Sequence, residues 1–377
     1  MSPLAVVPVY SGEMESATLV GLRDAPDADA FMESFCAAPR ALRSPELAKL
    51  APPAPYWRQF LDSKDASAES WIALRGERCL GRIGAAISPT RPGVGYVGFF
   101  ENALLEPGHD RTAKDLLEAA CAWLKARGVS QVYGPVDRNT WYSYRYTVAS
   151  TPGPDGYDEP LFAWEPPCVP PYLEAFRAAG FVDAEHYHSI AFRRVAGVSA
   201  IQASADVSKP GYEMASSAGI SFRPLGRAKE LESSLALLFE LASEGFRENF
   251  LFEPITVEQF SRLYVPLVGS LDYADFSHMA LDESGAPAAF LIAYHDRGYL
   301  VVKTLAVRAD HRKRGAGHAL MHLAFKAAAA RGIGLGISAL VRQGNTGTEA
   351  LETRHMPDAR SWRRDYVLLE RKIDASD

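Results

Sequence analysis

The residues best placed to do chemistry lie in one short segment, where three consecutive cations precede two glycines. It reads Arg312-Lys-Arg-Gly-Ala-Gly-His and joins an expected strand, 299–307, to an expected helix, 315–331. Backbone N–H groups in the first turn of a helix have no partner within the helix, and the helix dipole adds partial positive charge there. Glycines let a ligand approach that backbone closely. The segment therefore predicts an anion site, most naturally for a phosphate or pyrophosphate.

Two better-known phosphate-binding motifs are absent from this segment. A P-loop needs four residues between its first glycine and a Gly-Lys-Ser/Thr sequence, and this spacing does not occur. The dinucleotide-binding motif GxGxxG would need a glycine where the chain has Leu320. The predicted anion site is therefore of another kind.

The spacing Arg312-x-x-Gly315-x-Gly317 resembles the acetyl-CoA loop of the GNAT superfamily of N-acetyltransferases, whose pattern is Gln/Arg-x-x-Gly-x-Gly/Ala. The resemblance extends over roughly residues 218–371 and includes the strands on either side of the loop and helix. It implies acetyl-CoA, or another acyl-CoA, as co-substrate and no metal ion. It also implies a donor site formed by Leu305, Ala306 and Val307 of the strand, by Arg312, Lys313, Arg314, Gly315, Ala316, Gly317 and His318 of the loop, and by Asn345 near the pantetheine arm.

Acyl transfer to an amine requires a group that removes the proton of the amine. Glu244 and Glu248 follow the first helix of the second half, in a loop that often lines the acceptor groove in this family, and we expect Glu244 to be catalytic and Glu248 to contact the substrate. Glu352 and His355 are further catalytic candidates. The family often has a tyrosine seven residues after the asparagine, as general acid for the thiolate, and this chain has Glu352 there. The acid therefore comes from elsewhere, or the thiolate leaves without one; for each candidate, a solvated surface charge is the competing interpretation.

An aromatic loop at 137–146 is a second place where function and packing compete. Its candidate substrate contacts are Trp141, Tyr142 and Tyr144. Aromatic walls with few polar groups suit small-molecule pockets, whereas core packing explains the same residues without a ligand.

Two pairs of histidines have regular spacings in the sequence. His318 and His322 are four residues apart on one helix, but no third ligand has suitable spacing, so we expect no metal site. His186 and His188 alternate on an expected strand and are interpreted as structural.

These residues must be positioned by an α/β (α+β) fold of two similar halves. The sequence predicts strands at 71–74, 79–88, 93–101, 130–133, 186–193, 220–223, 276–282, 288–294, 299–307, 334–341 and 365–371, and helices at 113–127, 171–179, 230–242, 315–331 and 346–354. The segments Ala126-Arg-Gly-Val and Ala330-Arg-Gly-Ile recur with a separation of 204 residues, which indicates a duplication. We expect two tandem GNAT-like domains, each a mixed, mainly antiparallel sheet flanked by helices, at 1–195 and 217–377, joined by a linker at 196–216.

The first half is interpreted as a degenerate copy. The same separation aligns the basic loop with residues 108–113, where both loop glycines are lost. Asp110 then stands opposite Arg314, and a carboxylate at that place would repel a pyrophosphate. We therefore expect the first half to bind CoA poorly or not at all, and to serve as a scaffold that lines part of the acceptor pocket.

Composition limits the remaining possibilities for this chain of 377 residues. Its net charge of −6 argues against nucleic-acid binding, and no apolar run approaches the roughly 20 residues that cross a membrane. The N-terminus does not read as a signal peptide, and the cysteines, at 36, 79, 121 and 168, form no CxxC pair. We expect a cytoplasmic protein without nucleic-acid or membrane partners, of open oligomeric state.

The sequence thus predicts an N-acetyltransferase in which a primary amine of a small molecule attacks the thioester directly. A non-catalytic acyl-CoA-binding or regulatory protein is the first alternative. A Fem-like transferase that uses aminoacyl-tRNA is the second, against which the intact CoA-type loop and the acidic pI of about 5.9 argue.

Overall fold

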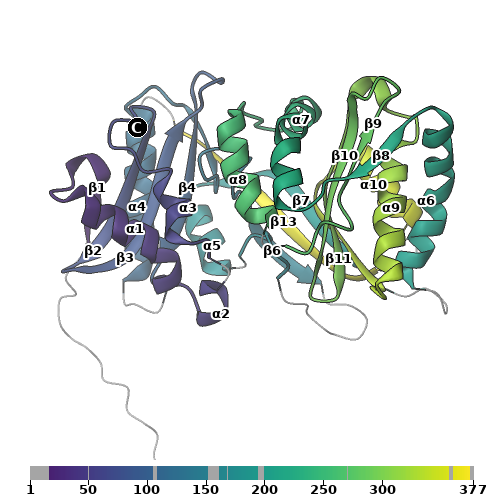
Figure 1. Cartoon of the computed structure of the whole chain (residues 1–377). Coiled ribbons are helices and arrows are strands. Elements are labelled where there is room, and N and C mark those ends of the chain that lie inside the picture. The colour runs from purple at the N-terminus through teal and green to yellow at the C-terminus, as the bar shows by residue number, and fades with distance from the viewer. Residues whose placement is uncertain are drawn as a thin grey trace, which may run out of the picture.

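The computed structural model describes residues 17–49, 51–104, 108–151, 161–167, 169–193, 199–269, 271–355 and 360–373. Over these residues one mixed sheet of 13 strands runs through the whole molecule (Figure 1). Its order is β1-β2-β3-β4-β5-β13-β7-β12-β11-β10-β9-β8, and β6 pairs with β13 beside this path.

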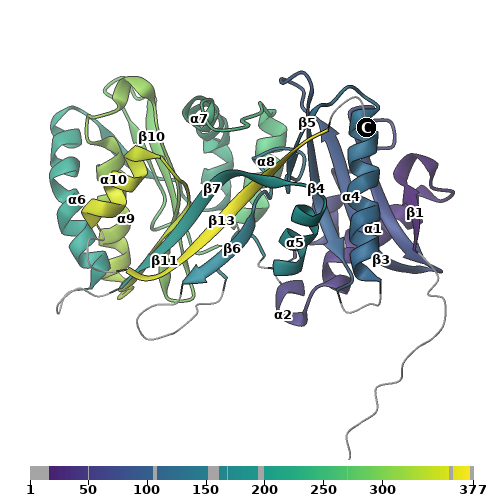
Figure 2. The same cartoon turned by 180° about the vertical axis from the view of Figure 1, so that it is seen from behind.

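The first half of the chain builds one side of this sheet and covers both of its faces. Helices α1, α2 and α3 lie on one face, and α4 and α5 lie on the other (Figures 1 and 2). The elements are β1 Thr18–Gly21, α1 Ala28–Leu42, α2 Pro45–Ala48, α3 Ala54–Arg58, β2 Ala68–Arg75, β3 Arg78–Ile87, β4 Val94–Asn102, α4 His109–Lys125, β5 Gln131–Gly134, β6 Tyr146–Thr151, α5 Pro170–Ala178 and β7 Val182–Phe192.

The second half repeats this order of elements. Helices α7 and α8 cover one face of its strands, and α6, α9 and α10 cover the other (Figures 1 and 2). The elements are α6 Ala200–Ser217, β8 Ser221–Pro224, α7 Ala228–Phe246, α8 Val257–Gly269, β9 His278–Leu281, β10 Pro287–Asp296, β11 Tyr299–Val307, α9 Ala316–Ala330, β12 Leu335–Arg342, α10 Thr346–His355 and β13 Arg360–Lys372.

The two halves exchange their last strands. Strand β7 of the first half pairs with β12 of the second, with His188 opposite Val341. Strand β13 of the second half pairs with β5 of the first, with Leu369 opposite Gly134, and lies beside β7 (Figure 2). Each half therefore completes the sheet of the other, an arrangement that the sequence does not reveal.

The predicted strands and helices are confirmed to within a few residues, whereas the predicted linker is wrong. Residues 200–217 form α6, which packs along α9. Its composition is small and polar because its buried side uses small residues such as Ala205, Ser204 and Ser208, all 3% exposed or less. Helix α8 was also not predicted. The division into domains at 195 and 217 stays a prediction.

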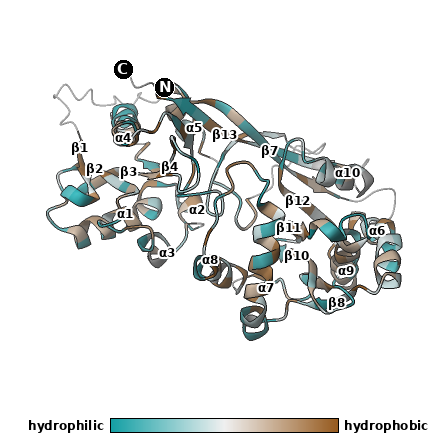
Figure 3. Cartoon of the chain, turned by 90° about the horizontal axis from the view of Figure 1, so that it is seen from above, coloured by the Kyte–Doolittle hydropathy of each residue, from teal (hydrophilic) through white to brown (hydrophobic). Residues whose placement is uncertain are grey.

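Figure 3 shows α7 and α8 at the junction between the halves, with hydrophilic and hydrophobic residues alternating along both helices. Within the described ranges, no helix has the length and apolar character needed to cross a membrane. Cys36, Cys79 and Cys121 are free thiols, and Cys168 lies outside the described residues.

Candidate functional site

The site begins where two central strands separate. Strands β11 and β12 pair in parallel only as far as Val302 and Ser338. Lys303 forms a bulge, because its neighbours Val302 and Thr304 pair with consecutive residues of β10. In β12, Leu340 has a φ of 59°, which interrupts the pleat. Beyond Val302, the backbone of β11 therefore has no strand partner on the β12 side, which leaves donors and acceptors for an extended ligand.

Helix α9 begins at the end of the separating strand. It is preceded by Gly315, which has a φ of 84°, and no side chain caps its first amides. A Cβ atom placed on Gly317 would lie 3.5 Å from side-chain carbons of both Leu305 and Val307. The structure thus brings the predicted strand residues and the predicted loop amides together at one edge of the sheet.

The loop before this helix carries unpaired positive charge. The side chains of Arg312, Lys313 and Arg314 are exposed and have no acidic partner among the residues described. The start of the loop is fixed, because Arg308 Nη2 lies 2.9 Å from an Asp282 carboxylate oxygen. The cations therefore add to the partial positive charge of the α9 N-terminus on a loop whose base is held in place.

Helix α6 supports this loop from behind. A Cβ atom on Gly315 would lie 2.5 Å from the carbonyl oxygen of Gly211, and one on Gly211 would lie 2.3 Å from Cβ of His318. His322 Nδ1 lies 2.8 Å from the Ala205 carbonyl oxygen of the same helix. His318 and His322 thus face α6, and in the part of the chain that the structure describes no group of three potential ligands could hold a metal ion.

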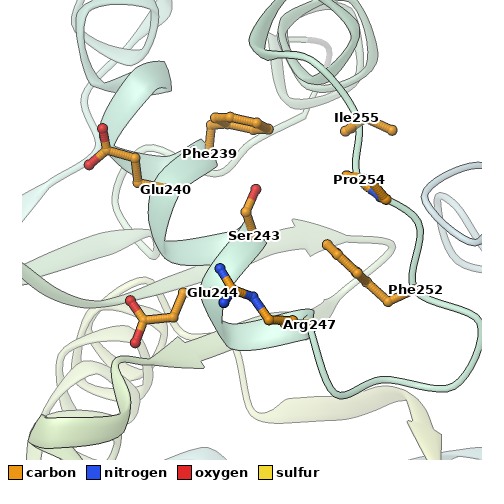
Figure 4. A pocket seen from close by; sticks show the side chains of 8 residues that line it. All are labelled: Phe239, Glu240, Ser243, Glu244, Arg247, Phe252, Pro254 and Ile255. Carbon is orange, nitrogen blue, oxygen red and sulfur yellow. The ribbon is translucent and has the colours of Figure 1, made fainter. Parts of the chain in front are cut away.

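The opposite face of the strand is covered by the end of α7. A Cβ atom on Gly245 would lie 3.1 Å from Cβ of Ala306. Beside it, a pocket of about 580 Å³ opens between α7 and the following loop. It is lined by Phe239, Glu240, Ser243, Glu244, Arg247, Phe252, Pro254 and Ile255 (Figure 4).

The two predicted acids near this pocket differ in position. Glu244 lines the pocket, and Figure 4 shows its carboxylate on the side of α7 away from the loop, whereas Ser243 faces the loop. Glu248 is exposed on the loop and does not line the pocket. Both carboxylates are exposed, and of the two only Glu244 lines the pocket.

Asn345 lies at the end of β12, where it begins α10. Its Oδ1 accepts a hydrogen bond from the Thr348 amide at 3.3 Å. The side chain is exposed, so it caps a helix at the edge of the sheet where the α9 loop also lies.

Glu352 is buried in a polar network at the strand separation. Its Oε2 lies 2.8 Å from His188 Nε2, and its Oε1 accepts a hydrogen bond from the Ser338 hydroxyl at 2.6 Å. His188 belongs to the exchanged strand β7 and is 4% exposed, and its Nδ1 has no hydrogen-bond partner. No sequence pattern predicts that a first-half histidine contacts Glu352, because the contact arises from the strand exchange. His355 ends α10, and its side chain lies outside the described residues.

Arg145 of the first half also reaches the strand separation. Its Nη1 donates to the carbonyl oxygen of Leu340 at 3.3 Å and its Nε to that of Tyr144 at 3.1 Å. The guanidinium lies 3.8 Å and 4.2 Å from the ring centres of Tyr144 and Tyr187. Burial, together with the charge of Arg145, lowers the pKa of Lys303 to about 7. Neither cation was predicted as a site residue from the sequence. Lys303 is nevertheless the single charged residue in the run Tyr299–Val307.

The three predicted aromatic residues of the loop lie in different places and do not form one wall of a pocket. Trp141 contacts the second half, whereas Tyr142 packs in the first. Trp141 Nε1 donates to the Glu253 carbonyl oxygen at 2.8 Å, and its ring packs against α7 and α8. Tyr142 packs within the first half, with its ring centre 4.7 Å from that of Phe60. Of the three predicted aromatic contacts, only Tyr144 lies at the strand separation.

The equivalent place in the first half is filled. Strands β4 and β5 pair only from Val94 to Tyr96, and then separate. The amide of Phe99, whose φ is 55°, donates to the buried carboxylate of Asp137. A Cβ atom on Gly98 would lie 2.2 Å from the Val136 carbonyl oxygen, so the chain after β5 closes the gap.

Comparisons with known proteins show a family match in the second half and the fold of the whole chain. Residues 235–355 match the model of the acetyltransferase (GNAT) family. A solved tandem GNAT protein from the clavulanic acid biosynthesis pathway superimposes over 96% of this chain and 100% of its own, with a TM-score of 0.50 and 14% identity. This chain has a tandem GNAT fold.

Two further solved structures agree at the level of the fold. A GCN5-related N-acetyltransferase from Kribbella flavida has a TM-score of 0.52 and 12% identity, over 97% of this chain and 73% of its own. A probable N-acyltransferase from Enterococcus faecalis V583 has a TM-score of 0.51 and 10% identity, over 96% of this chain and 73% of its own. No curated protein matches the sequence.

The matched GNAT region runs from within α7 to the end of α10 and so contains the strand separation, the α9 loop and Glu352. The family is one of acyltransferases and generally uses acyl-CoA.

Proposed function

We propose that the chain is an acyl-CoA-dependent N-acyltransferase that transfers an acetyl group from acetyl-CoA to a primary amine of a small molecule. The uncapped start of α9 carries this proposal, because it stands beside three exposed cations at the end of a strand that has lost its neighbour. That combination suits a ligand with a pyrophosphate at one end and an amide-bearing arm at the other.

The residues at the second-half site fit such a donor. Arg312, Lys313 and Arg314 would neutralise the pyrophosphate, and the amides of Ala316, Gly317 and His318 would donate hydrogen bonds to it. The free backbone edge of Leu305, Ala306 and Val307 would bind the pantetheine arm, with Asn345 beside it. Acyl-CoA supplies the acyl group as a thioester, an activated form that an amine attacks directly.

The proton steps have candidates on opposite faces of the strand. On the α7 side, Glu244 would accept the proton of the amine, directly or through water. On the α10 side, His188 Nε2 and Glu352 Oε2 lie 2.8 Å apart and share a proton in a hydrogen bond. This proton would lie near the place where the thiolate would leave. Glu352 would thus take the role that the family often gives to a tyrosine. Backbone amides of β11 beyond Val302 would polarise the thioester oxygen.

The first half would act as a scaffold and as one wall of the acceptor pocket. It supplies His188 through strand exchange and Tyr144 through the aromatic loop. Buried Glu253 ties the loop after α7 to the first half, because it accepts hydrogen bonds from Ser88, Thr90 and Tyr96. We propose a small-molecule amine as the acceptor, without nucleic-acid or membrane partners and in the cytoplasm.

One observation favours a second candidate, a non-catalytic acyl-CoA-binding protein. Both carboxylate oxygens of Glu352 are already engaged, by His188 and Ser338. A sensor would bind acyl-CoA without consuming it.

Release of CoA from acetyl-CoA in the presence of a panel of primary amines tests the proposal. We expect turnover with at least one amine, and a fall in kcat of about 100-fold in both Glu244→Gln and Glu352→Gln. Glu232→Gln is the matched control, because Glu232 is exposed on α7 away from the site. Binding of acetyl-CoA without turnover for any amine would favour the sensor instead.

A further inference from the structure

Two cations from different halves of the molecule converge where β11 and β12 separate. Lys303 is the bulge residue immediately after the last β11–β12 pair. Arg145 is anchored to Leu340, two positions after the last paired residue of β12. Arg145 and Leu340 both have positive φ angles, 79° and 59°, although neither is glycine. Such backbone conformations are unfavourable for residues with side chains and persist where the surrounding structure holds them.

No acidic side chain balances these two charges within the described ranges. The hydrogen bonds of Arg145 go to carbonyl oxygens through Nε and Nη1, and its Nη2 has no partner among the described residues. The nearby buried acids are committed elsewhere, Glu352 to His188 and Ser338, and Glu165 to Arg364. The charge of Arg145 disfavours the charged form of Lys303, and an anion bound between them would offset that effect.

We infer that Arg145 and Lys303 form a subsite for a carboxylate group of the acceptor, so that the acyl group is transferred to an amine that also bears a carboxylate. This inference rests on the proposed function, since it specifies the acceptor of that same site. With the amine bound there, Lys303 gains the anionic neighbour that the protein itself does not provide.

The subsite belongs to the acceptor side rather than to the donor. The donor phosphates would lie at the start of α9, on one face of β11. Arg145 lies on the other face, because it stacks on the ring of Tyr144, which packs in one cluster with Phe250 and Leu251 of the loop after α7. A donor and an acceptor would thus approach the strand separation from opposite faces.

The donor groups match a carboxylate better than a larger anion. Two of the three guanidinium nitrogens of Arg145, Nε and Nη1, already donate to the carbonyl oxygens of Tyr144 and Leu340. Nη2 and the Lys303 ammonium remain, one for each oxygen of a carboxylate. A phosphate group carries more charge and more acceptor oxygens than these two donors can satisfy.

Calorimetric titration tests the subsite independently of turnover. Glycine, β-alanine and other amino acids, each paired with its carboxamide, are titrated into the protein saturated with CoA, which carries no acyl group to transfer. We expect each preferred amino acid to bind about 10-fold more tightly than its carboxamide, which corresponds to about 1.4 kcal/mol. Arg145→Met and Lys303→Met should each reduce that preference to about two-fold or less. Two variants are used because Arg145 also contacts Leu340, and a folding defect in one leaves the other informative.

The control is Arg127→Met, which removes an exposed arginine that stacks on Trp123 in the first half, with its guanidinium 4.0 Å from the ring centre. It should retain the full preference. Equal affinity for amino acid and carboxamide, a preference that survives both variants, or no binding at roughly 10 mM would overturn the inference. A carboxylate preference without any consumption of acetyl-CoA would leave the subsite standing and refute the transferase.

Discussion

The two halves carry the same backbone device at equivalent places and use it in opposite ways. Phe99 in β4 and Lys303 in β11 are 204 residues apart, and each is a bulge residue beside the point where its strand leaves its parallel neighbour. The Phe99 side chain is 6% exposed and packs against Phe35, Trp57 and Phe60. Lys303 is a cation instead, and the charge of Arg145 acts on it.

The two halves also differ in how their cations are balanced by acidic groups. In the first half, the buried carboxylate of Glu101 pairs with Arg43 and lies 3.7 Å from Arg82, and Asp137 accepts the Phe99 amide. The cations there are thus compensated inside the protein. In the second half, the cations of the α9 loop and of the strand separation lack acidic partners among the described residues. Both halves thus keep the separation of the two parallel strands. We expect that a half can bind a ligand there only where side chains do not fill the separation.

The largest expected effect comes from emptying the filled gap. Phe99→Ala should lower the free energy of unfolding by about 3 kcal/mol, because it removes a buried ring from an aromatic cluster. Lys303→Ala at the equivalent place should not lower it, because loss of a cation that the fold carries at a cost offsets the packing that is lost. Urea denaturation of both variants measures the difference. Equal losses would mean that the second-half gap is packed as tightly as the first.

A smaller effect is expected from the two glycines of the α9 loop. Gly315→Ala should destabilise the protein by about 2 kcal/mol, because its φ of 84° and the nearby Gly211 carbonyl oxygen leave no place for a Cβ atom. Gly317→Ala should be neutral or stabilise by about 0.5 kcal/mol, since the position is helical and its neighbours are 3.5 Å away. The first half has Ala113 at the position equivalent to Gly317. Chemical denaturation compares them, and a stable Gly315→Ala protein would contradict the packing of α6 on the loop.

A further effect is a pH dependence of stability that arises at Lys303. Its pKa is about 7 in the folded protein and 10.5 without the fold. Between these values the unfolded chain binds one more proton than the folded chain, so stability rises with pH from about 7 towards 10. Below pH 7 both states are protonated, and the charged form is carried at a cost.

Lys303→Met removes this titration. The free energy of unfolding of the wild type relative to Lys303→Met should increase by about 2 kcal/mol between pH 7 and 9, measured by urea denaturation at each pH. Parallel curves for the two proteins would show that Lys303 keeps an ordinary pKa in the folded state.

The sequence predicted most elements, including the start of α9, because these depend on local patterns. The alternation and spacing of apolar residues identified the strands and the long helices, and Arg312-x-x-Gly315-x-Gly317 identified the start of α9. Helix α6 was missed because its buried stripe is made of alanine and serine, which read as a linker.

The contacts at the strand separation could not be predicted, because they join distant parts of the chain. His188 meets Glu352 only through strand exchange, and Arg145 meets Leu340 only through a positive φ that no residue type announces. Lys303 was open to detection as an isolated cation in an apolar strand, although its partner was not.

The central claim is that the second half alone binds acyl-CoA, and calorimetric titration of acetyl-CoA tests it most directly. The triple variant Arg312→Glu/Lys313→Glu/Arg314→Glu reverses three exposed charges and leaves the packing of α6 on Gly315 untouched. Lys326→Glu, on the exposed side of the same helix but away from its start, is the matched control. We expect one acetyl-CoA per chain, bound about 100-fold more weakly by the triple variant and normally by the control. Two bound molecules per chain, or undiminished affinity in the triple variant, would contradict the account.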